Sequence, residues 1–121
     1  MAIKIKRVYE TVDPADGKRI LVDRLWPRCL TRERAAVDHW VKEPAPSDTL
    51  RRWYGHEPDK WTEFKTRYFA ELGERPEEVK RLLELVGTDE VTFVFSSREM
   101  ERNHAAALKE YIETLLSATD W

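Results

Sequence analysis

The chain has 121 residues, of which 41% are hydrophobic and 36% charged, and its formal net charge is −2. This length and composition predict one globular domain over residues 1–121 and exclude disordered, collagen-like and low-complexity proteins. No apolar run reaches the ~18 residues of a membrane span, the N-terminus lacks a signal-peptide pattern, and a single cysteine excludes an internal disulfide. We therefore expect a soluble cytoplasmic protein with no membrane association.

Residues 3–9 and 20–25 are the first two predicted strands. Isoleucine alternates with lysine at the start of residues 3–9, which is typical of a strand at or near a sheet edge. Residues 20–25 begin with an apolar run, which predicts a more buried strand, and Pro27 follows because proline cannot donate to a sheet ladder. About ten residues join the two segments, which is short for a parallel crossover. The pair is therefore either parallel or an antiparallel hairpin.

The middle of the chain predicts short helices and one ambiguous segment. Thr31 is suited to cap a short helix through residues 35–36, and Ser47 is suited to cap a helix that Gly55 ends. Residues 37–42 alternate in polarity, so they form either a third strand or a helix.

The C-terminal half predicts three longer helices and one clear strand. Proline opens each helix predicted for residues 58–72 and 76–86, and glycine follows each. Residues 91–95 are almost entirely apolar and favour a buried strand, and residues 101–116 show helical spacing of apolar side chains. Strands followed by helices predict a small layered α/β domain with a mostly parallel four-stranded sheet flanked by helices.

Charge is distributed unevenly along the chain. Residues 1–34 carry a net charge of +4, whereas the remainder carries −6. A local excess of cations in an otherwise acidic protein favours an anion site over a broad nucleic-acid surface. The same cations are also compatible with solvated strand edges.

The polar residues that follow the predicted strands are the candidate site, because ligands of open α/β sheets bind beyond the carboxyl ends of the strands. Candidate ligand-binding residues are Arg24, Trp26, Arg28, Lys42, Ser97, Arg98, Asn103 and His104. Arg24, Arg28 and Arg98 are suited to clamp an anion, since guanidinium groups bind carboxylates and phosphates in a bidentate way. Asp23 and His56 are candidate catalytic groups for proton transfer.

Each of these residues also has a structural interpretation. The arginines can pair with carboxylates, Trp26 can pack against a core, and Asp23, His56 and Asn103 can cap helices or turns. The His and Cys spacings do not match a zinc site, and neither a Gly-x-Gly-x-x-Gly motif nor a P-loop is present. We therefore expect no metal and no cofactor. Any phosphate site has to use Arg, Lys and helix N-termini.

The string Ile-Leu-Val-Asp-Arg-Leu-Trp-Pro-Arg at residues 20–28 resembles the signature of the YeaO-like family, the domain of unknown function 488. Three further matches are Ala45-Pro46-Ser47 with Leu50-Arg51 and Trp53, His56 with Pro58 and Trp61, and Asn103-His104-Ala105. The resemblance covers about residues 3–112. It implies an α/β fold and a bacterial or archaeal cytoplasmic protein, and it implies no established activity.

The chain departs from the family pattern at two places. The family usually has glycine after the Trp-Pro-Arg triplet, where this chain has Cys29. If that glycine adopts a positive φ, Cys29 should be strained or the turn altered. The family usually has Lys-Asp after the last strand, where this chain has Arg98-Glu99 with the same charges.

We therefore expect a protein that binds an anionic small molecule, a nucleotide or a phosphorylated metabolite, at the C-terminal edge of the sheet, either as an enzyme or as a binding protein. The alternative is a non-catalytic module that binds nucleic acid or a protein partner. The net charge of −6 after residue 34 weighs against nucleic acid. Substrate, reaction class and oligomeric state stay open.

Overall fold

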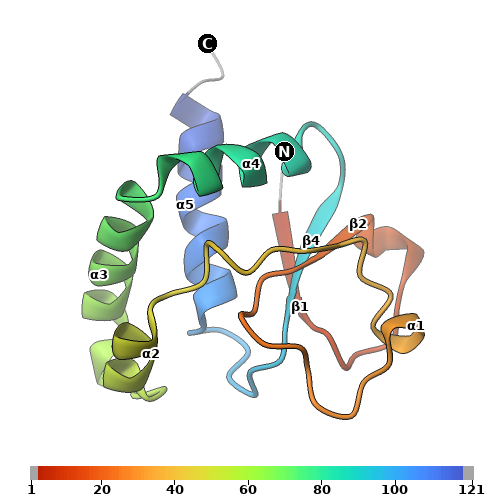
Figure 1. The fold of residues 1–121 in the computed structure, drawn as a ribbon, viewed down its shortest axis with the longest axis horizontal. Helices are drawn as coiled ribbons and strands as arrows, with labels where there is room; N and C mark the ends of the chain where they lie inside the picture. The colour runs from red at the N-terminus through yellow and green to blue at the C-terminus, as the bar shows by residue number, and fades with distance from the viewer. Residues whose placement is uncertain (1–2, 119–121) are drawn as a thin grey trace.

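A computed structural model describes residues 3–118, in which four parallel strands form one sheet in the order β1-β4-β2-β3 (Figure 1). The strands are β1 (Ile3–Arg7), β2 (Lys18–Leu21), β3 (His39–Trp40) and β4 (Val91–Phe95). All three pairings are parallel, and β4 lies between β1 and β2. The first two strands are therefore not a hairpin, and the predicted α/β fold with a parallel sheet is confirmed.

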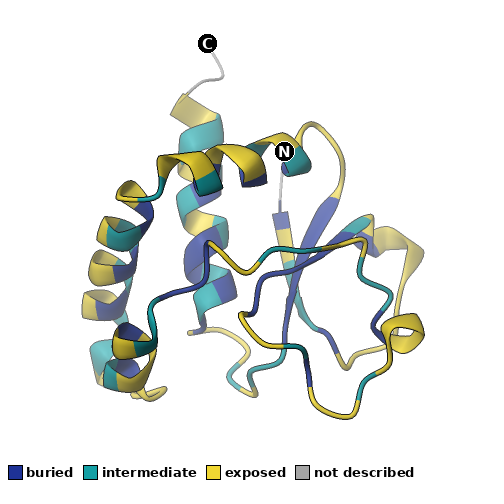
Figure 2. Ribbon diagram, viewed as in Figure 1, coloured by how far each residue is buried: buried dark blue, intermediate teal, exposed yellow. Residues whose placement is uncertain are grey.

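Strand β4 is the centre of the sheet. It pairs with β1 over its full length, from Ile3 opposite Val91 to Arg7 opposite Phe95, and with β2 from Lys18 onward. All five of its residues are buried (Figure 2), because both faces of a central strand are covered. This explains why residues 91–95 carry almost no polar side chains.

Within residues 3–118, the helical elements are two 3-10 turns and five α-helices. They are η1 (Pro14–Asp16), α1 (Arg32–Ala35), α2 (Asp48–Tyr54), η2 (Pro58–Lys60), α3 (Trp61–Gly73), α4 (Pro76–Val86) and α5 (His104–Ala118). Thr31 and Ser47 cap α1 and α2 through their side-chain oxygens, and Gly55 ends α2 in the left-handed conformation, as predicted. No helix within residues 3–118 is long and apolar enough to cross a membrane.

Several predicted elements differ in extent from the observed ones. The first strand ends at Arg7 instead of residue 9, and the helix predicted for residues 58–72 is divided into η2 and α3. The second strand ends at Leu21 instead of continuing to residue 25, because its partner β4 also ends and the chain turns away after Val22. Residues 37–42 contain the two-residue strand β3 and no helix. The last helix begins at His104 instead of residue 101, because the Asn103 side chain accepts the Ala106 N–H and fixes the start of the helix.

The two faces of the sheet are covered in different ways (Figures 1 and 2). Helices α2 to α5 lie on one side and enclose the larger apolar core, in which Phe64, Tyr68, Phe93 and Ile112 are fully or almost fully buried. The other face has a smaller core and is covered mainly by loops and α1. That core consists of Val8, Leu21, Ala35 and Val94, with Trp26, Leu30, Val37 and Trp40 packed against it.

A buried ion cluster completes the loop-covered face. Asp16 is 6% exposed and Arg19 is 2% exposed, and the Arg19 guanidinium donates to the Asp16 carboxylate at 2.6 Å. Lys6 Nζ donates to the same carboxylate at 3.1 Å, and Arg19 also donates to the Ala35 carbonyl oxygen at 2.9 Å. Burial alone would raise the pKa of Asp16, but hydrogen bonds from a backbone N–H and from the two cations outweigh burial and hold that pKa below its ordinary value.

Replacing Asp16 should therefore destabilise the protein strongly. We expect Asp16→Ala to lower the free energy of unfolding by about 3–5 kcal/mol at pH 7, because it leaves the Arg19 guanidinium buried without its counter-charge. A carboxyl with a lowered folded pKa stabilises the fold above its unfolded pKa of about 4, and this stabilisation is lost as the pH falls through the folded pKa. Urea denaturation at pH 7 and at acidic pH measures both effects.

The matched control is Asp89→Ala. Asp89 pairs with Lys18 at 3.2 Å but its side chain is 65% exposed, so its loss should cost less than about 1 kcal/mol. Equal effects of the two substitutions would contradict the role of the buried cluster.

Cys29 adopts the backbone conformation that favours glycine. Its φ is +59°, so the family's glycine position is indeed a left-handed turn and Cys29 is strained there. We expect Cys29→Gly to raise the free energy of unfolding by up to about 1 kcal/mol relative to Cys29→Ala, which keeps a Cβ at this φ. Thermal and urea denaturation of the two variants test this prediction, and an alanine variant as stable as the glycine variant would refute it.

Candidate functional site

The carboxyl ends of the four parallel strands meet at one edge of the sheet, and the candidate site lies there. The segment after β2 carries Asp23, and the segment after β4 carries Ser96 and leads to α5. Since β2 and β4 are neighbours, these two segments lie side by side. The fold therefore brings together residues that are more than seventy positions apart, as Asp23 and Ser96 show.

The Asp23 carboxylate connects the two segments. One oxygen, Oδ2, accepts the Ser96 N–H at 2.9 Å and the Ser96 hydroxyl at 2.7 Å. The other oxygen, Oδ1, lies 2.8 Å from Nε2 of His104. Both atoms of this contact are buried, and within residues 3–118 neither forms a hydrogen bond, so the two groups face each other at close range without an aligned hydrogen bond. Two of the predicted site residues, Asp23 and His104, are thus in direct contact.

The loop from Ser96 to Asn103 is held rigidly at several points. Arg7, at the end of β1, donates to the carbonyl oxygens of Ser97 at 2.9 Å and Ser96 at 3.1 Å. Asn103 is 1% exposed. Its side-chain N–H donates to the Glu99 carbonyl oxygen at 2.7 Å, and its Oδ1 accepts the Ala106 N–H at 2.9 Å. These contacts place His104 as the first residue of α5, facing Asp23.

Burial and hydrogen bonding act in opposite directions on Asp23. Burial alone would raise the pKa of this carboxyl, but the contact with His104 and the two hydrogen bonds from Ser96 outweigh burial, so the pKa lies below its ordinary value. Asp23 is therefore a carboxylate at neutral pH. A buried ionised group that accepts two hydrogen bonds from Ser96 and faces His104 orients these two partners.

His104 is the member of this centre that a ligand can reach. Its side chain is 19% exposed, and its Nδ1 has no hydrogen-bond partner within residues 3–118. With Nε2 held by Asp23, Nδ1 accepts a proton or hydrogen bond when the imidazole is neutral and donates when the imidazole is cationic. Ser96 donates its hydroxyl proton to Asp23 and not to an imidazole, so it is not arranged as the nucleophile of a Ser–His pair.

The predicted anion-binding cations lie on exposed positions of the same edge, but no contact joins them to one another. Arg24 donates to the Pro46 carbonyl oxygen at 3.1 Å, and Lys42 lies over the Trp40 ring at 4.2 Å from its centroid. Arg28 follows the second strand, and its carbonyl oxygen accepts the Tyr9 hydroxyl at 2.9 Å. Arg98 is exposed in the loop before α5. None of the four forms an ion pair within residues 3–118.

The other candidates are placed as follows. His56 is exposed with a φ of +58°, and its ring is tilted by 59° against that of Tyr54 with centroids 5.9 Å apart. It helps to lower the pKa of the Glu99 carboxyl, after two backbone N–H donors that contribute more. The Ser97 hydroxyl accepts the Glu99 N–H at 3.1 Å. Trp26 packs against the smaller core. Within residues 3–118 no three His, Cys, Asp or Glu side chains are placed to hold a metal ion.

Sequence reasoning missed Arg7 as a residue that shapes this edge. It looked like one more cation of an exposed strand, whereas its guanidinium fixes the loop after β4 and also lies 4.9 Å from the Tyr9 ring centroid. The available signal was position, because Arg7 ends the strand and its side chain therefore reaches the same edge as the loops.

Breaking the Asp23–His104 contact should destabilise the fold. We expect Asp23→Ala to lower the free energy of unfolding by about 3 kcal/mol, because it removes the acceptor of two Ser96 donors and the charged group that faces buried His104 Nε2. In a double-mutant cycle with His104→Ala the two losses should be less than additive, since both remove the same contact. Urea denaturation at pH 7 measures the cycle, with Asp48→Ala, an exposed ion-paired carboxylate, as the control. Strictly additive losses would show that the two groups are not coupled.

Comparison with known proteins places this chain in a family of which the two relatives named below are uncharacterised. The model of the inactive DUF488-N3 subclade matches residues 2–120. The chain is 38% identical over 115 residues to the uncharacterized protein YeaO of Escherichia coli, covering 95% of this chain and all of that protein. It is 41% identical over 110 residues to an uncharacterized protein of Mycobacterium tuberculosis, covering 91% of this chain and 92% of that protein.

No solved structure matches the chain. The family match covers nearly every residue, and both relatives align over almost their whole length. This chain therefore belongs to the DUF488 family, within its inactive DUF488-N3 subclade.

Proposed function

We propose that this protein binds an anionic small molecule, a nucleotide or a phosphorylated metabolite, at the carboxyl edge of the sheet, and that it binds this ligand without converting it. The observation that carries the proposal is the group of four exposed cations at this edge, none of which has an ion-pair partner within residues 3–118. Three carboxylates of the edge accept hydrogen bonds from the protein itself, and a fourth, Glu43, is exposed beside Lys42.

The occupied carboxylates are Glu10, Asp23 and Glu99. Glu10 accepts the Arg7 N–H at 3.0 Å, and Glu99 accepts the N–H groups of Glu101 and Arg102 at 2.9 and 3.1 Å. A carboxylate that accepts backbone N–H groups keeps its charge but has fewer free lone pairs for a cationic ligand. The cations Arg24, Arg28, Lys42 and Arg98 offer charge and donors to an anion.

Binding without turnover is supported by the state of the central groups. The Ser96 hydroxyl donates to Asp23 Oδ2, so it is not directed at a substrate, and the buried Asp23 Oδ1 faces His104 Nε2 at 2.8 Å. The description of the subclade as inactive points in the same direction. The side chains of Asn103 and Ser97 form hydrogen bonds with backbone groups of Glu99. We therefore assign both residues to positioning the loop.

The test is calorimetric titration with inorganic phosphate, nucleoside mono- and diphosphates and sugar phosphates. We expect Arg98→Ala to weaken binding by about tenfold or more, since a charge-assisted hydrogen bond contributes about 1.5–3 kcal/mol. The control is Arg81→Ala, which removes the same charge from an exposed position of α4, at the other end of the sheet (Figure 1).

The ligand should be recovered unchanged after long incubation with the protein. Titrations that stay flat at millimolar concentrations of every anion would refute the proposal. Conversion of the ligand would refute binding without turnover.

A further inference from the structure

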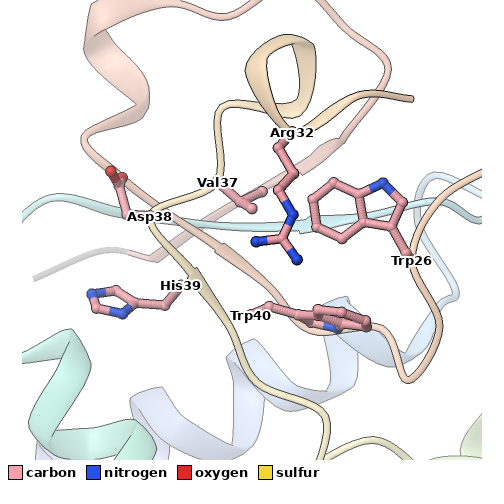
Figure 3. Close-up of a pocket in the computed structure, with 6 residues that line it drawn as sticks. All are labelled: Trp26, Arg32, Val37, Asp38, His39 and Trp40. Atoms are coloured by element: carbon pink, nitrogen blue, oxygen red, sulfur yellow. The ribbon is translucent and has the colours of Figure 1, made fainter.

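A cavity of about 150 Å³ lies beside the short edge strand β3, on the loop-covered side of the sheet (Figure 3). Its lining residues are Trp26, Arg32, Val37, Asp38, His39 and Trp40. None of the cations assigned above to the carboxyl-edge anion site lines it. The cavity therefore requires its own explanation.

The aromatic walls of the cavity are fixed by the protein. The Trp26 indole N–H donates to the Leu30 carbonyl oxygen at 2.6 Å, and the Trp40 indole N–H donates to the Asp23 carbonyl oxygen at 2.7 Å. The two rings meet edge to face, with centroids 5.4 Å apart and planes inclined by 67°. Because both indole donors are used, the rings present apolar π-surface to the cavity, and they keep this arrangement without a ligand.

Cations dominate the polar part of the wall. The Arg32 guanidinium reaches into the space beside both indole rings (Figure 3), and its Cζ lies 5.8 Å from the Trp26 ring centroid. Lys42 stands next to the wall, 4.2 Å from the Trp40 ring centroid. Neither cation forms an ion pair within residues 3–118.

The acidic residue of the cavity does not balance these charges. One carboxylate oxygen of Asp38 accepts the Arg19 N–H at 2.8 Å, so the carboxylate is directed toward the sheet. Figure 3 shows Asp38 at the margin of the cavity, away from the two indoles and from Arg32. The Arg32 guanidinium would therefore repel a cationic ligand beside the indoles, whereas it can pair with an anionic group.

We propose that this cavity binds a planar aromatic ring that carries an anionic group. The ring packs against the indoles of Trp26 and Trp40, and the anion pairs with Arg32, whose guanidinium can bind a carboxylate or phosphate through two parallel hydrogen bonds. The volume of about 150 Å³ is below the ~300 Å³ at which pockets for drug-sized ligands begin, so the cavity takes one ring system and leaves larger substituents outside.

This inference does not depend on the proposed function, because it rests on Trp26, Arg32 and Trp40, none of which that proposal uses; Lys42, beside the wall, belongs to the carboxyl-edge site. The shared chemistry, an aromatic ring with an anion, is found both in nucleotides and in aromatic acids. Adenosine 5′-monophosphate and benzoate represent these two sources, and inorganic phosphate tests whether an anion alone is sufficient.

The experiment follows the indole N–H signals of the ¹⁵N-labelled protein by NMR during titration with each probe. We expect adenosine 5′-monophosphate or benzoate to shift the signals of Trp26 and Trp40 and to leave those of Trp53 and Trp61 in place. Arg32→Ala should weaken this binding by about tenfold or more. Arg34→Ala is the matched control, because Arg34 is an exposed arginine of the same helix α1 and does not line the cavity.

A response to only one probe identifies the source and still supports the cavity as the site. Three results would overturn the proposal: Trp26 and Trp40 signals that do not move with either probe at millimolar concentration, equal effects of Arg32→Ala and Arg34→Ala, or shifts with inorganic phosphate as large as those with the aromatic anions. Because Arg98→Ala leaves this cavity intact, loss of binding in that variant reports on the carboxyl-edge site alone.

Discussion

The pairing of β4 with β1 on one side and β2 on the other is the constraint on which the rest of the structure depends. This strand comes last in the chain, so the sheet closes only when residues 91–95 insert between two strands from the first twenty-one residues. Parallel pairing then places every strand's carboxyl end at the same edge. The contact between Asp23 and His104 is a direct result, because one follows β2 and the other begins the helix after β4.

The two buried aspartates stabilise the two regions that apolar packing does not reach. Helices supply a large apolar core on one face, but the opposite face is covered by loops whose few apolar side chains form only a small cluster. Asp16 adds an ion cluster to that face, in which its carboxylate pairs with both Arg19 and Lys6 and Arg19 also donates to the Ala35 carbonyl oxygen. Asp23 does the same at the carboxyl edge with His104 and Ser96. Buried charges are tolerated at both places because each has several partners.

Local signals predicted the elements well, and they failed where a residue's role depends on distant partners. The caps at Thr31 and Ser47 and the strand at residues 91–95 follow from side-chain chemistry and apolar patterning alone. Asp23 and His104 were singled out separately, but 80 intervening residues hid their contact. Arg19 was not expected in the core, since a charged residue at the start of a strand is usually solvated, and only tertiary structure supplies its partner Asp16.

Residue 23 links the two regions to which we assign ligands. Its carboxylate holds His104 at the carboxyl edge, and its carbonyl oxygen accepts the Trp40 indole N–H that fixes one wall of the aromatic cavity. The side chain of Asp23 thus positions His104, and its main-chain carbonyl positions Trp40. The two indole N–H groups are already hydrogen-bonded, so the aromatic wall is fixed before any ligand arrives. Such preorganisation lowers the entropic cost of binding a ligand there. Asp23 Oδ1 and His104 Nε2 differ from these groups, because they face each other at 2.8 Å and neither forms a hydrogen bond within residues 3–118.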